Sequence, residues 1–146
     1  MAENRLPDRD GPKPVELVFD PFVVDWVCRE LDIHPSHPEA IGISWGGQLI
    51  AGVIYSGYRP RDSAVEMSIY STSPRWATRR VLRAVFGYPF TQLNLKRVEA
   101  VTRDDNHAAQ RLLDRLGFTR EGVLRSGYQG RDGYIYGMLS DECRWT

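Results

Sequence analysis

The stretch RVEAVTRDDNHAAQRLLDRLGFTREG, residues 97–122, decides how the fold of this chain is interpreted. It begins with a short β-branched run, Arg97 to Val101, and continues through a polar cluster at Asp104 to Asn106. Apolar residues then recur at helical spacing from Ala108 to Leu116. Gly117 follows, where glycine best adopts the left-handed conformation that ends a helix. The pattern predicts a strand, a turn, an amphipathic helix and a second strand.

The composition fits one domain with no preference for a charged partner. The chain has 146 residues, and its 19 basic residues balance 19 acidic ones. A chain of this length folds around one core, and its neutral field gives no reason to expect nucleic acid or an acidic membrane as a partner. Residues 1–14 are polar and proline-rich, which predicts a flexible tail before a single domain at 15–146.

Two further features indicate a cytoplasmic protein. Cys28 and Cys143 are far apart and neither belongs to a C-x-x-C pair, so we interpret both as thiols in a reducing compartment. The first residues lack the apolar stretch of a signal peptide, and no run elsewhere is long enough to span a bilayer. We therefore expect a soluble, cytoplasmic chain.

Outside the opening stretch, apolar periodicity predicts further strands and helices. Val65 to Tyr70 alternates strictly, with Glu66, Ser68 and Tyr70 on one face, and Ser73-Pro74 is a good start for a helix that runs to Phe86. The other predicted elements are a helix at Phe22 to Leu31 and strands at Val15 to Phe19, Ile41 to Trp45, Leu49 to Ser56, Thr119 to Leu124 and Tyr134 to Leu139. These elements predict an α+β or mixed α/β fold with six or seven strands and three or four helices.

The opening stretch also carries a pattern that runs from Asn106 to Gly122, N-x-x-A-x-x-L-x-x-x-L-G-F-x-x-E-G. By this pattern the chain resembles the GNAT acyltransferase superfamily. Upstream segments look like its ribosomal-protein N-terminal acetyltransferase branch; they are Trp76 to Thr78, Leu82 to Ala84, Tyr88 to Phe90 and Arg97 to Ala100. The resemblance covers the chain from about Glu39 onward. It implies a GNAT-like fold in which two central parallel strands splay apart.

The resemblance implies acetyl-coenzyme A as cosubstrate, bound where Val65 to Tyr70 and Arg97 to Val101 separate. The pantetheine arm would pair with the first strand at Ser68, Ile69 and Tyr70, and a backbone N–H there would face the thioester oxygen. The family asparagine that commonly contacts this arm corresponds to Asn106. Asn is also a preferred N-cap residue, so the two roles are compatible.

The resemblance places the pyrophosphate at the start of the helix after Val65 to Tyr70, where free N–H groups favour an anion. The family loop R/Q-x-x-G-x-G/A is replaced here by Thr72-Ser-Pro-Arg-Trp-Ala77. On one interpretation, charged side chains replace the lost glycine contacts, so the candidate residues are Arg75, Trp76, Ala77, Arg79 and Arg80. On the other, the arginines are a solvated helix face and the phosphate site has decayed. Trp76 is either a core residue or a surface on which adenine stacks.

Acyl transfer to an amine needs a group that removes a proton, and Glu66 is the candidate base because it matches the family glutamate on this strand. The family's usual acid is missing, since Leu113 stands in place of its tyrosine and Ala109 in place of the serine of the ribosomal branch. The candidate acids are Tyr128, Tyr134, Tyr136 and Ser126. His34, His37 and His107 are too scattered for a metal site, and we expect none.

These observations predict an N-acetyltransferase that moves acetyl from coenzyme A to a primary amine, either a protein N-terminus or a lysine. The altered loop and missing acids leave a second hypothesis, a GNAT-fold binding or assembly module without catalysis. A third is a nucleobase-modifying relative of the kind found in phages, which only the basic turn supports. The sequence is compatible with a monomer or a homodimer.

Overall fold

A computed structural model describes residues 15–146, so the predicted tail at 1–14 lies outside the described residues. A seven-stranded sheet has the order β1-β2-β3-β4-β5-β7-β6, in which only β4 and β5 run parallel. The strands are β1 (Glu16–Val18), β2 (Glu39–Trp45), β3 (Gln48–Arg59), β4 (Ala64–Ser71), β5 (Arg97–Arg103), β6 (Thr119–Tyr128) and β7 (Arg131–Leu139). This mixed sheet confirms the predicted fold class.

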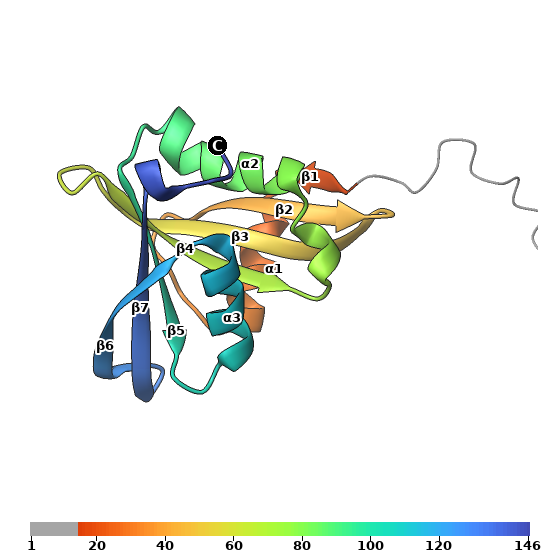
Figure 1. Ribbon diagram of the computed structural model, residues 1–146. Helices are drawn as coiled ribbons and strands as arrows, with labels where there is room; N and C mark the ends of the chain where they lie inside the picture. Colours follow the sequence, from red (N-terminus) through yellow and green to blue (C-terminus); the bar gives the residue numbers. More distant parts are fainter. Residues whose placement is uncertain (1–14) are drawn as a thin grey trace, which may run out of the picture.

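Three α-helices cover the sheet: α1 (Phe22–Leu31), α2 (Arg79–Gly87) and α3 (His107–Leu116). Short helical turns are η1 (Pro74–Trp76), η2 (Tyr88–Gln92) and η3 (Ser140–Glu142). Figure 1 shows β2 and β3 running across the view and β5, β6 and β7 running down it, with α3 in the angle between the two groups. The sheet is therefore divided into two parts that meet at β4 and β5.

The two faces of the sheet bury different cores. The main core lies under α2 and α3 and includes Val53, Met67, Phe86 and Leu113. The smaller core lies under α1, where Val23 and Val27 pack on Ile54. Gly52 allows α1 to approach the sheet closely, because a Cβ added there would lie only 2.4 Å from Cγ2 of Val27.

Glycines with positive φ lie at the turns of the β2–β3 and β6–β7 hairpins. Gly46 and Gly47, at φ +60° and +81°, form the turn between β2 and β3, in the gap between the two strands predicted there. The last two strands are longer than the predicted Thr119 to Leu124 and Tyr134 to Leu139, because the glycine-punctuated segment between them is itself a bulged hairpin closed at Gln129-Gly130. This extension brings Tyr128 and Gln129 toward the centre of the sheet.

The helix after β4 begins later than the sequence pattern predicts. Ser73 caps only the short turn η1, where its hydroxyl accepts a hydrogen bond from the N–H of Arg75 at 3.3 Å. A new helix, α2, then begins at Arg79 with Thr78 as its N-cap, accepting from the N–H of Val81 at 3.2 Å. The prediction of one helix starting at Ser73-Pro74 is therefore wrong. The interruption allows the indole of Trp76 to turn into the main core.

Candidate functional site

The candidate site starts where β4 and β5 separate. The two strands pair only at Ala64 with Arg97, Val65 with Val98 and Glu66 with Glu99. Beyond that point β4 continues to Ser71 and β5 to Arg103, but the register contains no further pair between them. The side of β4 that faces β5 is thus left without a neighbouring strand over about five residues, a length that an extended ligand can occupy in place of a strand.

A cavity of about 250 Å³ fills the gap between the separated strands. Ser68 and Ile69 of β4 line one wall and Ala100 to Arg103 of β5 line the other. Asn106, Ala109 and Leu112 of α3 also reach it, as do Glu30 and Leu31 at the end of α1. Because α1 and α3 cover opposite faces of the sheet, the cavity opens toward both faces through the splay.

Asn106 lies at the entrance on the α3 side. Its Oδ1 accepts a hydrogen bond from the N–H of Ala109 at 3.1 Å, which makes it the N-cap of α3. The buried amide of Gln110 donates to the carbonyls of Arg103 and Asp104 at 3.2 and 3.1 Å and so fixes the turn before this helix. The structure therefore brings Asn106 and Ser68 together on one cavity.

The hairpin between β6 and β7 forms the wall on the α1 side. Tyr128 and Gln129 both line the cavity. The side-chain amide of Gln129 donates to the carbonyls of Leu31 and Asp32 at 3.0 and 3.3 Å, and thereby ties this hairpin to the end of α1. Sequence reasoning missed Gln129, since a glutamine before a glycine turn carries no signal of a contact about one hundred residues away.

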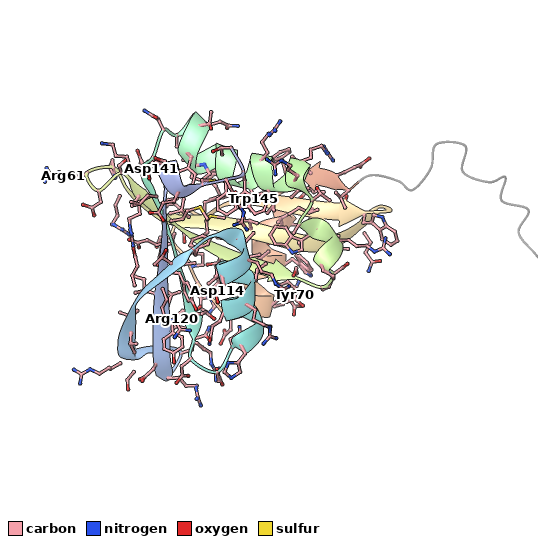
Figure 2. The ribbon with its side chains drawn as sticks, viewed as in Figure 1. Arg61, Tyr70, Asp114, Arg120, Asp141 and Trp145 are labelled. Atoms are coloured by element: carbon pink, nitrogen blue, oxygen red, sulfur yellow. The ribbon has the colours of Figure 1, made fainter. Side chains whose placement is uncertain are left out.

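Tyr70 is directed away from the cavity. Its ring packs edge-on against Trp26 of α1, with 5.1 Å between centroids, and belongs to the smaller core. Figure 2 labels Tyr70 near the end of β4 beside α1. The side chain of Tyr70 is therefore structural, and only its backbone lies on the unpaired side of β4.

The predicted phosphate-binding residues are distributed around the start of α2 in different ways. Trp76 is 2% exposed, so its ring is a core residue and is not available to stack on adenine. The guanidinium of Arg75 lies over the ring of Trp45, 4.7 Å from its centroid. That of Arg80 donates to the carbonyl of Val15, while Arg79 is exposed at the helix start. Arg75 thus contacts the end of β2, and Arg80 contacts the residue before β1.

Glu66 lies at the last paired position of β4, where the strands begin to separate. It is half-buried beside a bulge in β3, formed where Gly57 adopts φ +62°. A Cβ added to Gly57 would lie 3.0 Å from Oε2 of Glu66, so the glycine leaves room for this carboxylate. Bulges of this kind commonly re-aim a side chain near a site.

Of the four candidate acids, only Tyr128 lines the cavity. Burial, with a smaller contribution from the charge of Glu66, raises its pKa above the ordinary value of 10.0. Tyr136 is fully buried, and Tyr134 is covered by the guanidinium of Arg120, 4.0 Å from its ring centroid; Figure 2 labels Arg120 on β6. Tyr128 therefore stays protonated near neutral pH and can donate a proton into the cavity.

At the paired end of β4 and β5, a charge network holds the strands. Arg59 and Arg97 both donate to Oε1 of Glu99, at 2.7 and 2.9 Å, and Arg97 also binds Glu121 of β6. Burial alone would raise the pKa of Glu99, but the hydrogen bonds from the two arginines outweigh it and lower the pKa below 4.5. Glu99 is therefore ionised and bound to two arginines at the paired end of the strands.

A second, larger cavity of about 790 Å³ lies beside Glu66. It sits where β3 runs past the start of β2 and is lined by Glu39, Glu66, Tyr58, Tyr88 and His37, among others. Because Glu66 and Ser68 lie on the same face of β4, two residues apart, this cavity adjoins the first one. Sequence reasoning did not identify it, since its residues come from four separate segments.

Over residues 15–146, no group of three or more His, Cys, Asp or Glu side chains is arranged to hold a metal ion. Within the same part of the chain, no helix is both long and apolar enough to cross a bilayer.

Comparisons with known proteins show which sequences this chain is similar to. The sequence model of the acetyltransferase (GNAT) domain family matches residues 26–119. The chain is 31% identical over 109 residues to the uncharacterized N-acetyltransferase YoaA of Bacillus subtilis (strain 168), covering 68% of this chain and 61% of that protein. It is 34% identical over 65 residues to the uncharacterized N-acetyltransferase p20 of Bacillus licheniformis, covering 42% and 36%. The chain thus spans less than two thirds of either relative.

Solved structures share the same architecture. One is a chimera of the spermidine N-acetyltransferase SpeG from Vibrio cholerae and hSSAT, with a TM-score of 0.66, 17% identity, and coverage of 88% of this chain and 98% of that one. At this identity the likeness concerns the fold alone.

Proposed function

This chain belongs to the acetyltransferase (GNAT) domain family, and we propose that it transfers an acetyl group from acetyl-coenzyme A to a primary amine. One observation carries the proposal: β4 has no neighbouring strand after Glu66, and this open side faces a cavity between two parallel strands. Bound acetyl-coenzyme A would supply an activated thioester carbonyl. The resemblance suggests two such amines, a protein N-terminus and a lysine side chain.

The residues of the cavity fit the arm of the coenzyme. The free backbone groups of β4 from Met67 to Ser71 would hold the amides of the pantetheine as a strand neighbour would. Ser68, Ile69 and Asn106 line the same space, and Ala109 leaves it open because its side chain is small. A backbone N–H of β4 near Ser68 would face the carbonyl oxygen as charge develops there.

For the pyrophosphate, the free N–H groups at the start of α2 are the proposed site. Thr78, rather than Ser73, caps this helix, and Arg79 is exposed there. We assign to Arg79 the charge-assisted contacts that replace the lost backbone contacts of the family loop's glycines. Arg75, which packs on Trp45, would stabilise the β2–β3 hairpin next to the proposed phosphate site.

Two side chains near the point where β4 and β5 separate, Glu66 and Tyr128, would carry out the proton transfers. Glu66 accepts a proton from the incoming ammonium, directly or through a water molecule, so that the amine nitrogen can attack the carbonyl carbon. As the carbon–sulfur bond breaks, Tyr128 donates its phenolic proton to the leaving sulfur, and the phenolate then takes the second proton from the nitrogen as the amide forms. The raised pKa of Tyr128 keeps that proton in place beforehand.

Calorimetric titration of the full chain with acetyl-coenzyme A tests the donor site, and release of free thiol in the presence of an amine tests turnover. We expect saturable binding at micromolar to millimolar ligand and thiol release that depends on the amine. Absence of heat at millimolar ligand would remove the proposal and favour the non-catalytic binding module.

A further inference from the structure

The cavity beside Glu66 has a composition suited to a positively charged ligand. Its lining includes the carboxylates of Glu39 and Glu66 and the rings of Tyr55, Tyr58 and Tyr88, but no lysine or arginine. Carboxylates and aromatic faces are the groups that bind ammonium ions, through charge-assisted hydrogen bonds and cation–π contact. Its volume of about 790 Å³ lies in the range of small-molecule sites.

The two carboxylates occupy different positions relative to the splay. Glu66 ends the paired part of β4 and lines the second cavity, and the next residue, Met67, lines the first. Glu39 begins β2, opposite Tyr55 of β3, and so lies two strands from β4. From the spacing of strands, the two Cα atoms are roughly 10 Å apart. Glu39 lies on the face of Tyr55 and Glu66 on the opposite face, so a ligand that reaches both carboxylates passes around the edge of β3, where Ser56, Gly57 and Tyr58 line the cavity.

The negative charge of Glu39 affects the pKa of a tyrosine in the same cavity. Burial, together with the negative charge of Glu39, raises the pKa of Tyr88 above its ordinary value. Tyr55 cannot offer its hydroxyl to a ligand, because that hydroxyl donates to the carbonyl of Val85 at 2.6 Å. Ser36 and His37 also line this end, and the carboxylate there is that of Glu39, beside the face of Tyr88.

We propose that this second cavity is the acceptor site and that it takes a small amine carrying two positive charges, with one nitrogen beside Glu66 for acetylation and the other held by Glu39. This inference rests on the proposed function, because the acceptor nitrogen must reach the donor cavity, which begins at Met67 beside Glu66. The second charge selects the acceptor, since an amine with a neutral far end leaves the Glu39 carboxylate unpaired.

The test compares two acceptors of equal length, 1,5-diaminopentane and 5-amino-1-pentanol, in the full chain and in two variants. Glu39→Gln removes the carboxylate of the site, and Glu142→Gln removes an exposed carboxylate of η3 as a matched control. We expect calorimetry to show diaminopentane binding about tenfold or more tighter than aminopentanol, as one charge-assisted hydrogen bond would give. Glu39→Gln should abolish most of this preference, and Glu142→Gln should leave it unchanged.

Thiol release with saturating acetyl-coenzyme A should show the same ratio in kcat/KM. Equal binding of the two amines, or an unchanged preference in Glu39→Gln, would overturn the dication assignment. Better acetylation of a short peptide with a free N-terminus than of diaminopentane would do the same. In each of those cases, binding of acetyl-coenzyme A and turnover with another amine would leave the proposed function standing, whereas lack of acetyl-coenzyme A binding removes the proposed function itself.

Discussion

Strands β4 and β5 are joined at one end and separated at the other, and the two ends differ in what surrounds them. The joined end, Ala64–Glu66 beside Arg97–Glu99, is held by registered pairing and by the arginines around Glu99. The separated end lines a cavity with Ser68, Asn106 and Tyr128. The comparison teaches that one strand pair provides both a rigid support and an open site, and that Glu66 lies at the boundary.

Blocking the separated end should have the largest effect. Ala109→Trp places an indole in the cavity of about 250 Å³, and we expect acetyl-coenzyme A to bind at least about 300-fold more weakly, about 3.4 kcal/mol. Calorimetry measures this loss. Ala108→Trp is the matched control, because Ala108 is the preceding residue of α3 and is exposed. If both variants bind the coenzyme as the unmodified chain does, the cavity is not the donor site.

Removing the charge of Glu66, where β4 and β5 begin to separate, should have the second largest effect. Glu66→Gln keeps the size of the side chain but removes the proposed base, so kcat should fall by about 100-fold while the affinity for acetyl-coenzyme A is retained. Steady-state thiol release and calorimetry separate the two quantities. An unchanged kcat would show that the amine loses its proton elsewhere.

The joined end should respond in stability instead of activity. Glu99→Gln removes charge-assisted bonds to Arg59 and Arg97, and we expect the free energy of unfolding to fall by about 2 kcal/mol near pH 7. Because folding lowers the pKa of Glu99, its contribution is complete above the ordinary value of 4.5 and is lost as the pH falls through the lowered pKa.

Urea unfolding at about pH 7 and about pH 3 therefore provides the measurement. The difference between Glu99→Gln and the unmodified chain should shrink at the acidic pH. A difference that stays constant with pH would mean that the carboxylate charge is not what stabilises this end.

The smallest expected effect is at the cavity wall. Tyr128→Phe removes the proposed proton donor, and we expect kcat to fall by about tenfold, because a thiolate can also leave without a proton. The raised pKa predicts that the midpoint of any activity loss from ionisation of this tyrosine lies above pH 10.0 in the unmodified chain. A pH–rate profile for both proteins checks this, and identical profiles with equal kcat would exclude Tyr128 as the acid.

The sequence allows the prediction of elements whose signals are local. The helix of residues 107–116 carries its cap at Asn106, its periodicity and its Gly117 stop within a single stretch, and the structure has all three. The alternation in Val65 to Tyr70 likewise predicts the strand β4. Such signals depend on backbone geometry alone, so they can be recognised without knowing what the element packs against.

Features that depend on distant partners could not be predicted in this way. Ser73-Pro74 is a good local helix start, but burial of Trp76 outweighs it and moves the start of α2 to Thr78. The pattern also gave no reason to pair Arg80 with the carbonyl of Val15. The second cavity and the contact of Gln129 arise in the same way, from segments that meet only in the folded chain.

The contact of Gln129 has a consequence for how this protein can vary. Its amide binds two main-chain carbonyls, at residues 31 and 32, and not their side chains. Substitutions that keep the backbone path at those two positions therefore preserve the connection, while position 129 requires a side chain with a donor of that reach. This contact joins the first and last thirds of the chain beside the cavity. It constrains the side chain at position 129 but not the side chains at positions 31 and 32.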